Sequence, residues 1–197
     1  MAGLWNRLQS VRGFGVGVAA LALLAGCAEL PMHAPTPNFD LIVKAKATRT
    51  APVALGQFKV DQGVNPEIDK GLSVRSNHLF SPYDHSFAQF LRQTVLTDLQ
   101  ASGLYDANAP LTLSGYLTES TLNVPTDKGD ASLGARFVLT RGEQKVFEKE
   151  LKAGATWESS FLGVTAIQDG INQYTSLYHK LLGILLSDSD YQKVNTK

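Results

Sequence analysis

Apolar side chains recur at two different spacings along this chain, and the spacings predict its elements. In two stretches the apolar residues lie three or four positions apart, which is typical of an amphipathic helix. The first stretch contains Phe87, Phe90, Leu91, Val95 and Leu99. The second contains Ile167, Ile171, Tyr174, Tyr178, Leu181 and Leu185. We therefore predict one helix in the middle of the chain and another near its end.

Polar residues and glycine indicate where these two helices begin and end. Ser81, Pro82 and Asp84 predict an N-cap, a first-turn proline and an acidic third position for the first helix. Gly103 predicts its C-terminal end, with a closing contact from the next residue. The segment 165–168, Thr-Ala-Ile-Gln, has the pattern of a capping box for the second helix.

Alternating apolar and polar residues predict strands. The clearest alternation covers residues 131–140, and 145–157 follows after a short turn. Residues 52–60 and 111–117 also indicate strands, 72–75 a short one, and 39–47 a strand or extended arm. The predicted fold class is α+β: a mixed, largely antiparallel sheet of about four to five strands, with two main helices packed on one face, in the order β-α-β-β-β-α.

The first 26 residues differ from the rest of the chain. Arg7 and Arg12 are their only charges, and the apolar run GFGVGVAALALLAG follows. This run is shorter than the roughly 20 residues that a membrane-spanning helix needs. It is typical of the apolar region of a secretory signal peptide. Cleavage would leave a net charge of about −2, which does not indicate nucleic-acid binding.

Cys27 is the only cysteine of the 197 residues. It could be a buried small apolar residue, a reactive thiol or a lipid attachment point. The sequence Leu-Ala-Gly-Cys at 24–27 resembles the lipobox of bacterial lipoproteins, and the charges, the apolar run and the Pro-rich segment around it occur in the matching order. The resemblance implies cleavage between Gly26 and Cys27, a diacylglyceryl group on the thiol and a further acyl chain, such as palmitate, on the new amine.

The lipobox also predicts location and domain organisation. Asp follows the cysteine in lipoproteins that enterobacteria retain at the inner membrane, but Ala28 stands there in this chain. The resemblance therefore implies the periplasmic face of the outer membrane. We predict a signal peptide (1–26), a lipidated N-terminus with a Pro-rich tether or arm (27–50), a periplasmic α+β domain (51–190) and a polar tail (191–197). The alternative for the Pro-rich segment is an irregular but packed arm.

The order of elements resembles a known family. Three parts of the chain resemble the YajG-like outer-membrane lipoproteins. They are the lipobox, the helix sequence SFAQFLRQTVLTDLQASGLYD and the strand sequence APLTLSGYLTES. More loosely, they resemble the periplasmic α/β domain shared by the TolB N-terminal region, LpoB-type activators and the curli-export lipoprotein. This resemblance implies a location and a fold, and it supplies no catalytic motif.

The sequence indicates binding rather than catalysis. It contains no known hydrolase, zinc or nucleotide motif, and we predict no catalytic residue, metal or cofactor besides the lipid on Cys27. His78 and His85 are expected in a loop and on a solvent-facing first turn. Trp157, Phe161 and Leu162 lie between the last strand and the last helix, where they either cover the core or form a patch that binds a partner.

Three functions are compatible with these features. The first is a non-enzymatic lipoprotein that binds a protein partner in cell-envelope maintenance. The second is an auxiliary lipoprotein of a transport or export system, which would require an apolar cavity between sheet and helices. The third is an envelope hydrolase, which would require convergent acids or a histidine–nucleophile pair. The oligomeric state and the partner's identity do not follow from the sequence.

Overall fold

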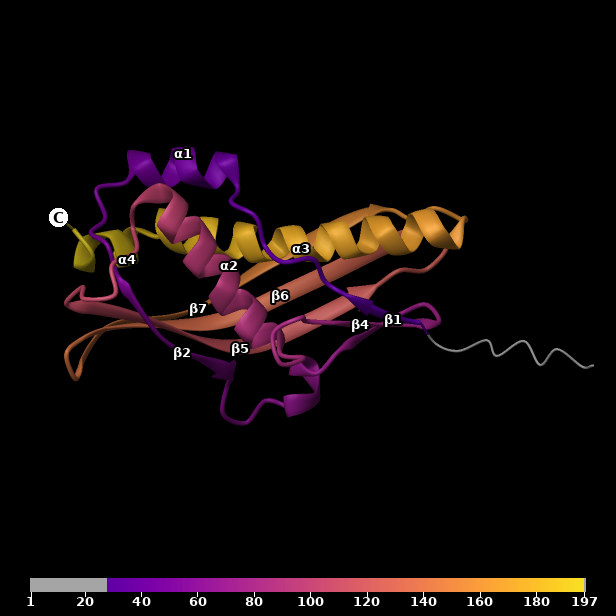
Figure 1. The fold of residues 1–197 in the computed structure, drawn as a ribbon, viewed down its shortest axis with the longest axis horizontal. Helices are drawn as coiled ribbons and strands as arrows, with labels where there is room; N and C mark the ends of the chain where they lie inside the picture. The colour runs from indigo at the N-terminus through magenta and orange to yellow at the C-terminus, as the bar shows by residue number, and fades with distance from the viewer. Residues whose placement is uncertain (1–27, 197) are drawn as a thin grey trace, which may run out of the picture.

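Four strands form the main sheet, in the spatial order β2-β5-β6-β7 (Figure 1). The computed structural model describes residues 28–196. β2 (Ala54–Val60) lies parallel to β5 (Leu111–Asn123), whereas β5, β6 (Lys128–Arg141) and β7 (Gln144–Glu158) form an antiparallel meander. The sheet is therefore mixed and largely antiparallel, as predicted.

Two helices cover one face of this sheet, α2 (Phe87–Ser102) and α3 (Gly163–Ser187) (Figure 1). Their apolar stripes are buried against the inward side chains of the strands. The rings of Phe87 and Tyr174 lie 5.6 Å apart, and those of Phe90 and Tyr178 lie 4.8 Å apart, in edge-to-face arrangements. The inward side chains of β6 are those the alternation predicted: Ala131, Leu133, Ala135, Phe137 and Leu139. The predicted order of strands and helices is confirmed.

The segment before β2 corrects the sequence analysis. Residues 39–47, predicted as a strand or extended arm, form the helix α1 (Phe39–Ala47). The side chain of Asn38 caps this helix by accepting a hydrogen bond from the Leu41 amide at 2.9 Å. Leu41 and Ala45, four residues apart, are buried, so the helical spacing overrides the apparent alternation.

The Pro-rich segment is packed rather than a free tether. β1 (Glu29–Pro31) pairs with β4 (Asn77–Phe80), which in turn pairs with β3 (Leu72–Val74). Met32, immediately after β1, is buried in the core. A short 3₁₀ helix, η1 (Pro66–Asp69), lies between β2 and β3. The packed-arm alternative therefore describes the segment from Ala28 onward.

Both long helices begin at residues other than those predicted. α2 is capped by Ser86, whose hydroxyl oxygen accepts a hydrogen bond from the Gln89 amide at 3.1 Å, not by Ser81. Asp84 and His85 have φ angles of 52° and 51°, and this left-handed backbone cannot belong to a right-handed helix. The end of α2 at Gly103, with a φ of 73°, is as predicted.

α3 begins at Gly163, before the predicted capping box, and no side chain caps its first turn. At its other end the chain continues into α4 (Ser189–Val194). Tyr191 on α4 is buried, with its ring 5.5 Å from that of Phe147. Residues 191–194 of the predicted polar tail therefore belong to a helix that covers part of the core. No helix within residues 28–196 is long and apolar enough to cross a membrane.

Candidate functional site

Three exposed apolar side chains lie where β7 is connected to α3, two in the loop and one in the first turn of the helix. Phe161 is 82%, Leu162 67% and Val164 87% exposed to solvent. We call these three residues the apolar tip. Phe161 and Leu162 belong to the patch that the sequence analysis suggested for a partner. Their exposure makes them available for a contact, and what they bind stays a prediction.

Trp157 does not belong to this exposed surface. It is half-buried and packs against the core. A Cβ atom added at Gly129 would lie 2.4 Å from the Trp157 ring, so the glycine provides the space that the ring occupies. Trp157 therefore covers the core, as the alternative interpretation proposed, whereas Val164 joins Phe161 and Leu162 on the surface.

Arg75 fixes the loop that carries the apolar tip. Its guanidinium group donates hydrogen bonds to the carbonyl oxygens of Val124 at 3.1 Å and Pro125 at 3.0 Å, and of Ser160 at 2.9 Å and Phe161 at 3.4 Å. Arg75 lies in the turn between β3 and β4, with a φ of 54°. One side chain thus joins the β3–β4 turn, the β5–β6 loop and the β7–α3 loop.

Ser159 and Ser160 add local hydrogen bonds to the same loop. The Ser159 amide donates to the Asp127 carbonyl at 2.8 Å, and its hydroxyl donates to the Pro125 carbonyl at 2.6 Å. The Leu162 amide donates to the Ser160 hydroxyl oxygen at 3.1 Å. The apolar tip is therefore presented on a backbone held by several hydrogen bonds.

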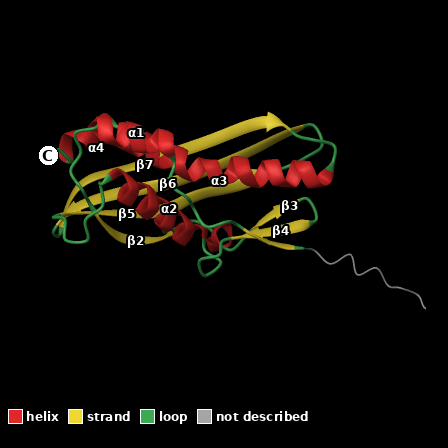
Figure 2. Ribbon diagram, turned by 45° about the horizontal axis from the view of Figure 1, so that its top comes forward, coloured by secondary structure: helices red, strands yellow, loops and turns green. Residues whose placement is uncertain are grey.

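The described part of the chain begins at the same end of the molecule as the apolar tip (Figure 2). The carbonyl of Ala28 accepts a hydrogen bond from the His78 amide at 3.0 Å, so Ala28 lies beside the start of β4. The turn containing Arg75 immediately precedes that strand. Cys27, the predicted lipidation site, and Gly26, the predicted residue before the cleaved bond, lie outside the described residues.

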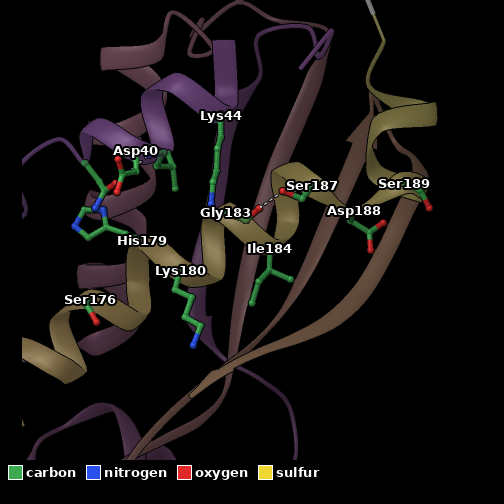
Figure 3. Close-up of a pocket in the computed structure, with 12 residues that line it drawn as sticks. Asp40, Lys44, Ser176, His179, Lys180, Gly183, Ile184, Ser187, Asp188 and Ser189 are labelled. Atoms are coloured by element: carbon green, nitrogen blue, oxygen red, sulfur yellow. Dashed lines mark hydrogen bonds between the residues drawn. The ribbon is translucent and has the colours of Figure 1, made fainter. Parts of the chain in front are cut away.

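A second surface feature is an open groove of about 770 Å³ between α1 and α3. Its walls include Asp40, Leu41 and Lys44 from α1 and Lys180 and Ile184 from α3. Figure 3 shows Lys44 extending from α1 toward α3. Apolar and charged side chains of both signs are mixed here, so the groove offers both apolar contacts and ion pairs to a ligand. We call it the α1–α3 groove.

A buried carboxylate joins the helices beneath the groove. Asp98 on α2 is fully buried. Its Oδ1 atom accepts a hydrogen bond from the Asn38 amide at 2.9 Å, and its Oδ2 atom lies 2.6 Å from Nδ1 of His179 in a second hydrogen bond. Asn38 caps α1 and His179 belongs to α3. The interaction therefore ties α1 to both long helices. The sequence analysis missed this site, although an Asp three residues after Val95 and one before Leu99 lies on the buried stripe of α2.

The Asp98–His179 pair has the arrangement that orients a catalytic base, but no described side chain completes it as a nucleophile. Ser176, one turn earlier on α3, donates its hydroxyl to the Gln173 carbonyl at 2.7 Å. His179 hydrogen-bonds to no serine, threonine or cysteine among residues 28–196. The contacts of the pair are those of a link between helices.

His78 and His85, the two histidines considered in the sequence analysis, do not form a site either. His78 lies in β4 rather than in the predicted loop. His85 is exposed, as expected, but it lies in a turn and its ring stacks on Phe80 at 4.5 Å. No cluster of three potential metal ligands occurs in the described part of the chain.

The fold and these two surfaces define an α+β domain with an apolar tip at one end and an open groove near the other. The fold is similar to that of a protein of the DUF330 family from Xanthomonas campestris, with a TM-score of 0.56 and 13% sequence identity. The similarity covers 81% of this chain and 95% of that protein. At this identity the likeness shows the fold alone.

Two further solved structures have lower scores. A candidate lipoprotein from Caulobacter crescentus has a TM-score of 0.35 and 14% identity over 50% of this chain and 79% of its own. The PelC dodecamer from Paraburkholderia phytofirmans has a TM-score of 0.34 and 18% identity over 72% of this chain and 91% of its own. Neither score supports an argument about this protein. No protein-family model and no curated protein sequence matches the chain.

Proposed function

We propose that this protein is a non-enzymatic lipoprotein, anchored through Cys27 to the periplasmic face of the outer membrane, that acts as an adaptor in cell-envelope maintenance. The lipobox sequence supports the anchor, and the resemblance to YajG-like lipoproteins supports the location. We further propose that the α1–α3 groove binds a protein partner. This is the accessory role that the sequence analysis placed first.

The observation that carries the proposal is the contrast between a filled interior and an open groove. The layer between sheet and helices is occupied by large side chains with less than 2% exposure, among them Phe87, Phe90, Tyr174 and Tyr178. A lipid-transport role would require an apolar cavity in that layer. The α1–α3 groove instead lies on the surface, where a polypeptide can reach it.

The position of the groove also supports a partner in the periplasm. The groove lies along the second half of α3, from Ser176 to Ser187, which is about 20 to 36 Å from the start of that helix at 1.5 Å per residue. The first turn adjoins the end where the chain leads to Cys27. An anchored molecule would therefore hold the groove away from the membrane, and the YajG-like lipoproteins are expected to face the same compartment.

Site-specific photocrosslinking in intact cells tests the partner site. Lys44 and Lys46 are both exposed on α1, but only Lys44 lines the groove. With benzoylphenylalanine replacing Lys44, we expect a discrete protein adduct that mass spectrometry identifies, and with Lys46 replaced we expect none. Filling the groove with Ser176→Trp should abolish the Lys44 adduct. Equal adducts from both positions, or an adduct that survives the Ser176→Trp substitution, would contradict the proposed site.

A further inference from the structure

We propose that the apolar tip enters the surface of the same bilayer that holds the lipid on Cys27, so that the domain contacts the membrane at two points. This inference rests on the proposed lipid anchor. It assigns Phe161, Leu162 and Val164 to a lipid surface rather than to a protein partner.

The first argument is the shortness of the connection to the anchor. The sequence predicted a Pro-rich tether or arm within residues 27–50, and a free tether would let the domain move far from the membrane. Ala28 is instead hydrogen-bonded to His78, and β1 is paired with β4 from Glu29 onward. One residue spans at most about 3.6 Å, so lipid on Cys27 would hold this end of the domain against the bilayer surface.

The second argument is that the tip is joined to that same end. Ala28 lies beside the start of β4, and Arg75 in the preceding turn hydrogen-bonds to the backbone of Ser160 and Phe161. Figures 1 and 2 both show the beginning of α3 and the beginning of β1 at one end of the molecule. A bilayer reached by Cys27 is therefore also the surface nearest to the tip.

The third argument is the chemistry of the tip. Isolated exposed apolar residues are ordinary on protein surfaces, but this loop and the first turn of α3 place three of them within four positions. The charged residues close to the loop are Arg75, Asp127, Lys128 and Glu158, two of each sign. Entry into the bilayer would therefore depend on the apolar side chains and not on the charge of the lipid headgroups.

A thiol-reactive, environment-sensitive fluorophore tests the inference on the full lipidated chain. Because Cys27 is the only cysteine and its thiol would carry lipid, Leu162→Cys supplies the one reactive thiol. Val43→Cys is the matched control, since Val43 is 53% exposed on α1, beside the groove. Each protein is reconstituted into vesicles of phosphatidylethanolamine and phosphatidylglycerol, with and without lipids that carry a doxyl quencher in the acyl chain.

We expect the label at Leu162→Cys to shift to shorter wavelength and to lose intensity with doxyl lipids, independently of the phosphatidylglycerol content. The label at Val43→Cys should do neither, and adding Phe161→Ser and Val164→Ser should reverse the effect at Leu162→Cys. An unquenched label at Leu162→Cys would overturn the inference. So would a wavelength shift that appears only with increasing protein concentration, because that would indicate a second copy of the chain.

The same experiment separates failure of the tip from failure of the anchor. The unaltered processed chain should take up no fluorophore if the thiol of Cys27 is lipidated. Uptake by the unaltered chain would contradict the anchor, and with it the reason for a bilayer at this end. An unreactive unaltered chain together with an unquenched Leu162→Cys label would overturn only the membrane contact of the tip.

Discussion

Arg136 on β6 contacts residues on or next to the other three strands of the main sheet. From β6, its guanidinium group donates hydrogen bonds to Asp61, just beyond β2, at 2.8 and 2.6 Å and to Glu148 on β7 at 2.6 Å. It also lies 4.5 Å from the ring centre of Tyr116 on β5. The hydrogen bonds that Arg136 donates hold the pKa of Asp61 below its ordinary value of 3.8. The hydrogen bonds to Asp61 and Glu148 also raise the pKa of Arg136. This pairing binds the parallel edge strand to the meander.

The Asp61 pairing predicts a pH-dependent stability. An acid with a lowered pKa in the folded state stabilises the fold above its unfolded pKa, and the effect is lost as the pH falls through the folded value. Asp61→Asn should therefore reduce the free energy of unfolding by about 1 kcal/mol at pH 7. The difference from the unaltered protein should shrink below about pH 4, in urea titrations at several pH values. A difference that does not change between pH 7 and pH 3 would contradict this assignment.

Single residues show why the sequence could identify an apolar cluster but could not predict which of its side chains are buried and which are exposed. Trp157, Phe161 and Leu162 are close in sequence and similar in chemistry. Their different burial involves residues far along the chain, since Gly129 leaves space for the Trp157 ring and Arg75 hydrogen-bonds to the Phe161 carbonyl. Such non-local contacts are not encoded in local spacing.

At the scale of elements, α1 shows how a local pattern can mislead. Residues 39–47 alternate apolar and polar side chains as a strand would, yet nine residues form a helix. Tertiary contacts decide the outcome, because Asp98 accepts a hydrogen bond from the Asn38 amide and the core takes up Leu41 and Ala45. The Asn38 cap, with Asp40 in the first turn and Lys44 in the last, was the local signal for a helix.

The attachment of α1 predicts a large effect from one substitution. Asp98→Ala would leave the Asn38 amide and the His179 ring without their buried partner. We expect a loss of about 2–4 kcal/mol in the free energy of unfolding, measured by urea denaturation. Asp106→Ala is the matched control, because the Asp106 side chain accepts only an exposed hydrogen bond from the Asn108 amide at 2.9 Å, and it should cost about 0.5 kcal/mol. Equal effects of the two substitutions would contradict the role of Asp98 as a link between helices.

At the scale of the whole molecule, the order of elements was predictable because it depends on local spacing. Periodicity alone predicted the two long helices and the strands at 111–117, 131–140 and 145–157. Each of these elements is present in the structure. The packing of the first and last segments was not predictable in the same way. β1 depends on pairing with β4, and α4 depends on the contact of Tyr191 with Phe147, both across long stretches of sequence.

These long-range contacts give the molecule two different ends. One end carries the apolar tip and the start of the described chain, and the other carries α1, α4 and the groove (Figure 1). In the proposed account the first end faces the bilayer and the second faces a periplasmic partner. This arrangement depends on lipid at Cys27, because the proposed membrane contact of the apolar tip rests on that anchor.

Metabolic labelling of Cys27 with a fatty-acid analogue tests that central claim most directly. The unaltered chain should incorporate the analogue, migrate as a processed protein and fractionate with the outer membrane. Cys27→Ser should remain as an unprocessed precursor and incorporate no analogue, because it lacks the thiol that accepts the diacylglyceryl group. Unchanged labelling of the Cys27→Ser chain, or an unaltered chain that carries no lipid, would contradict the account.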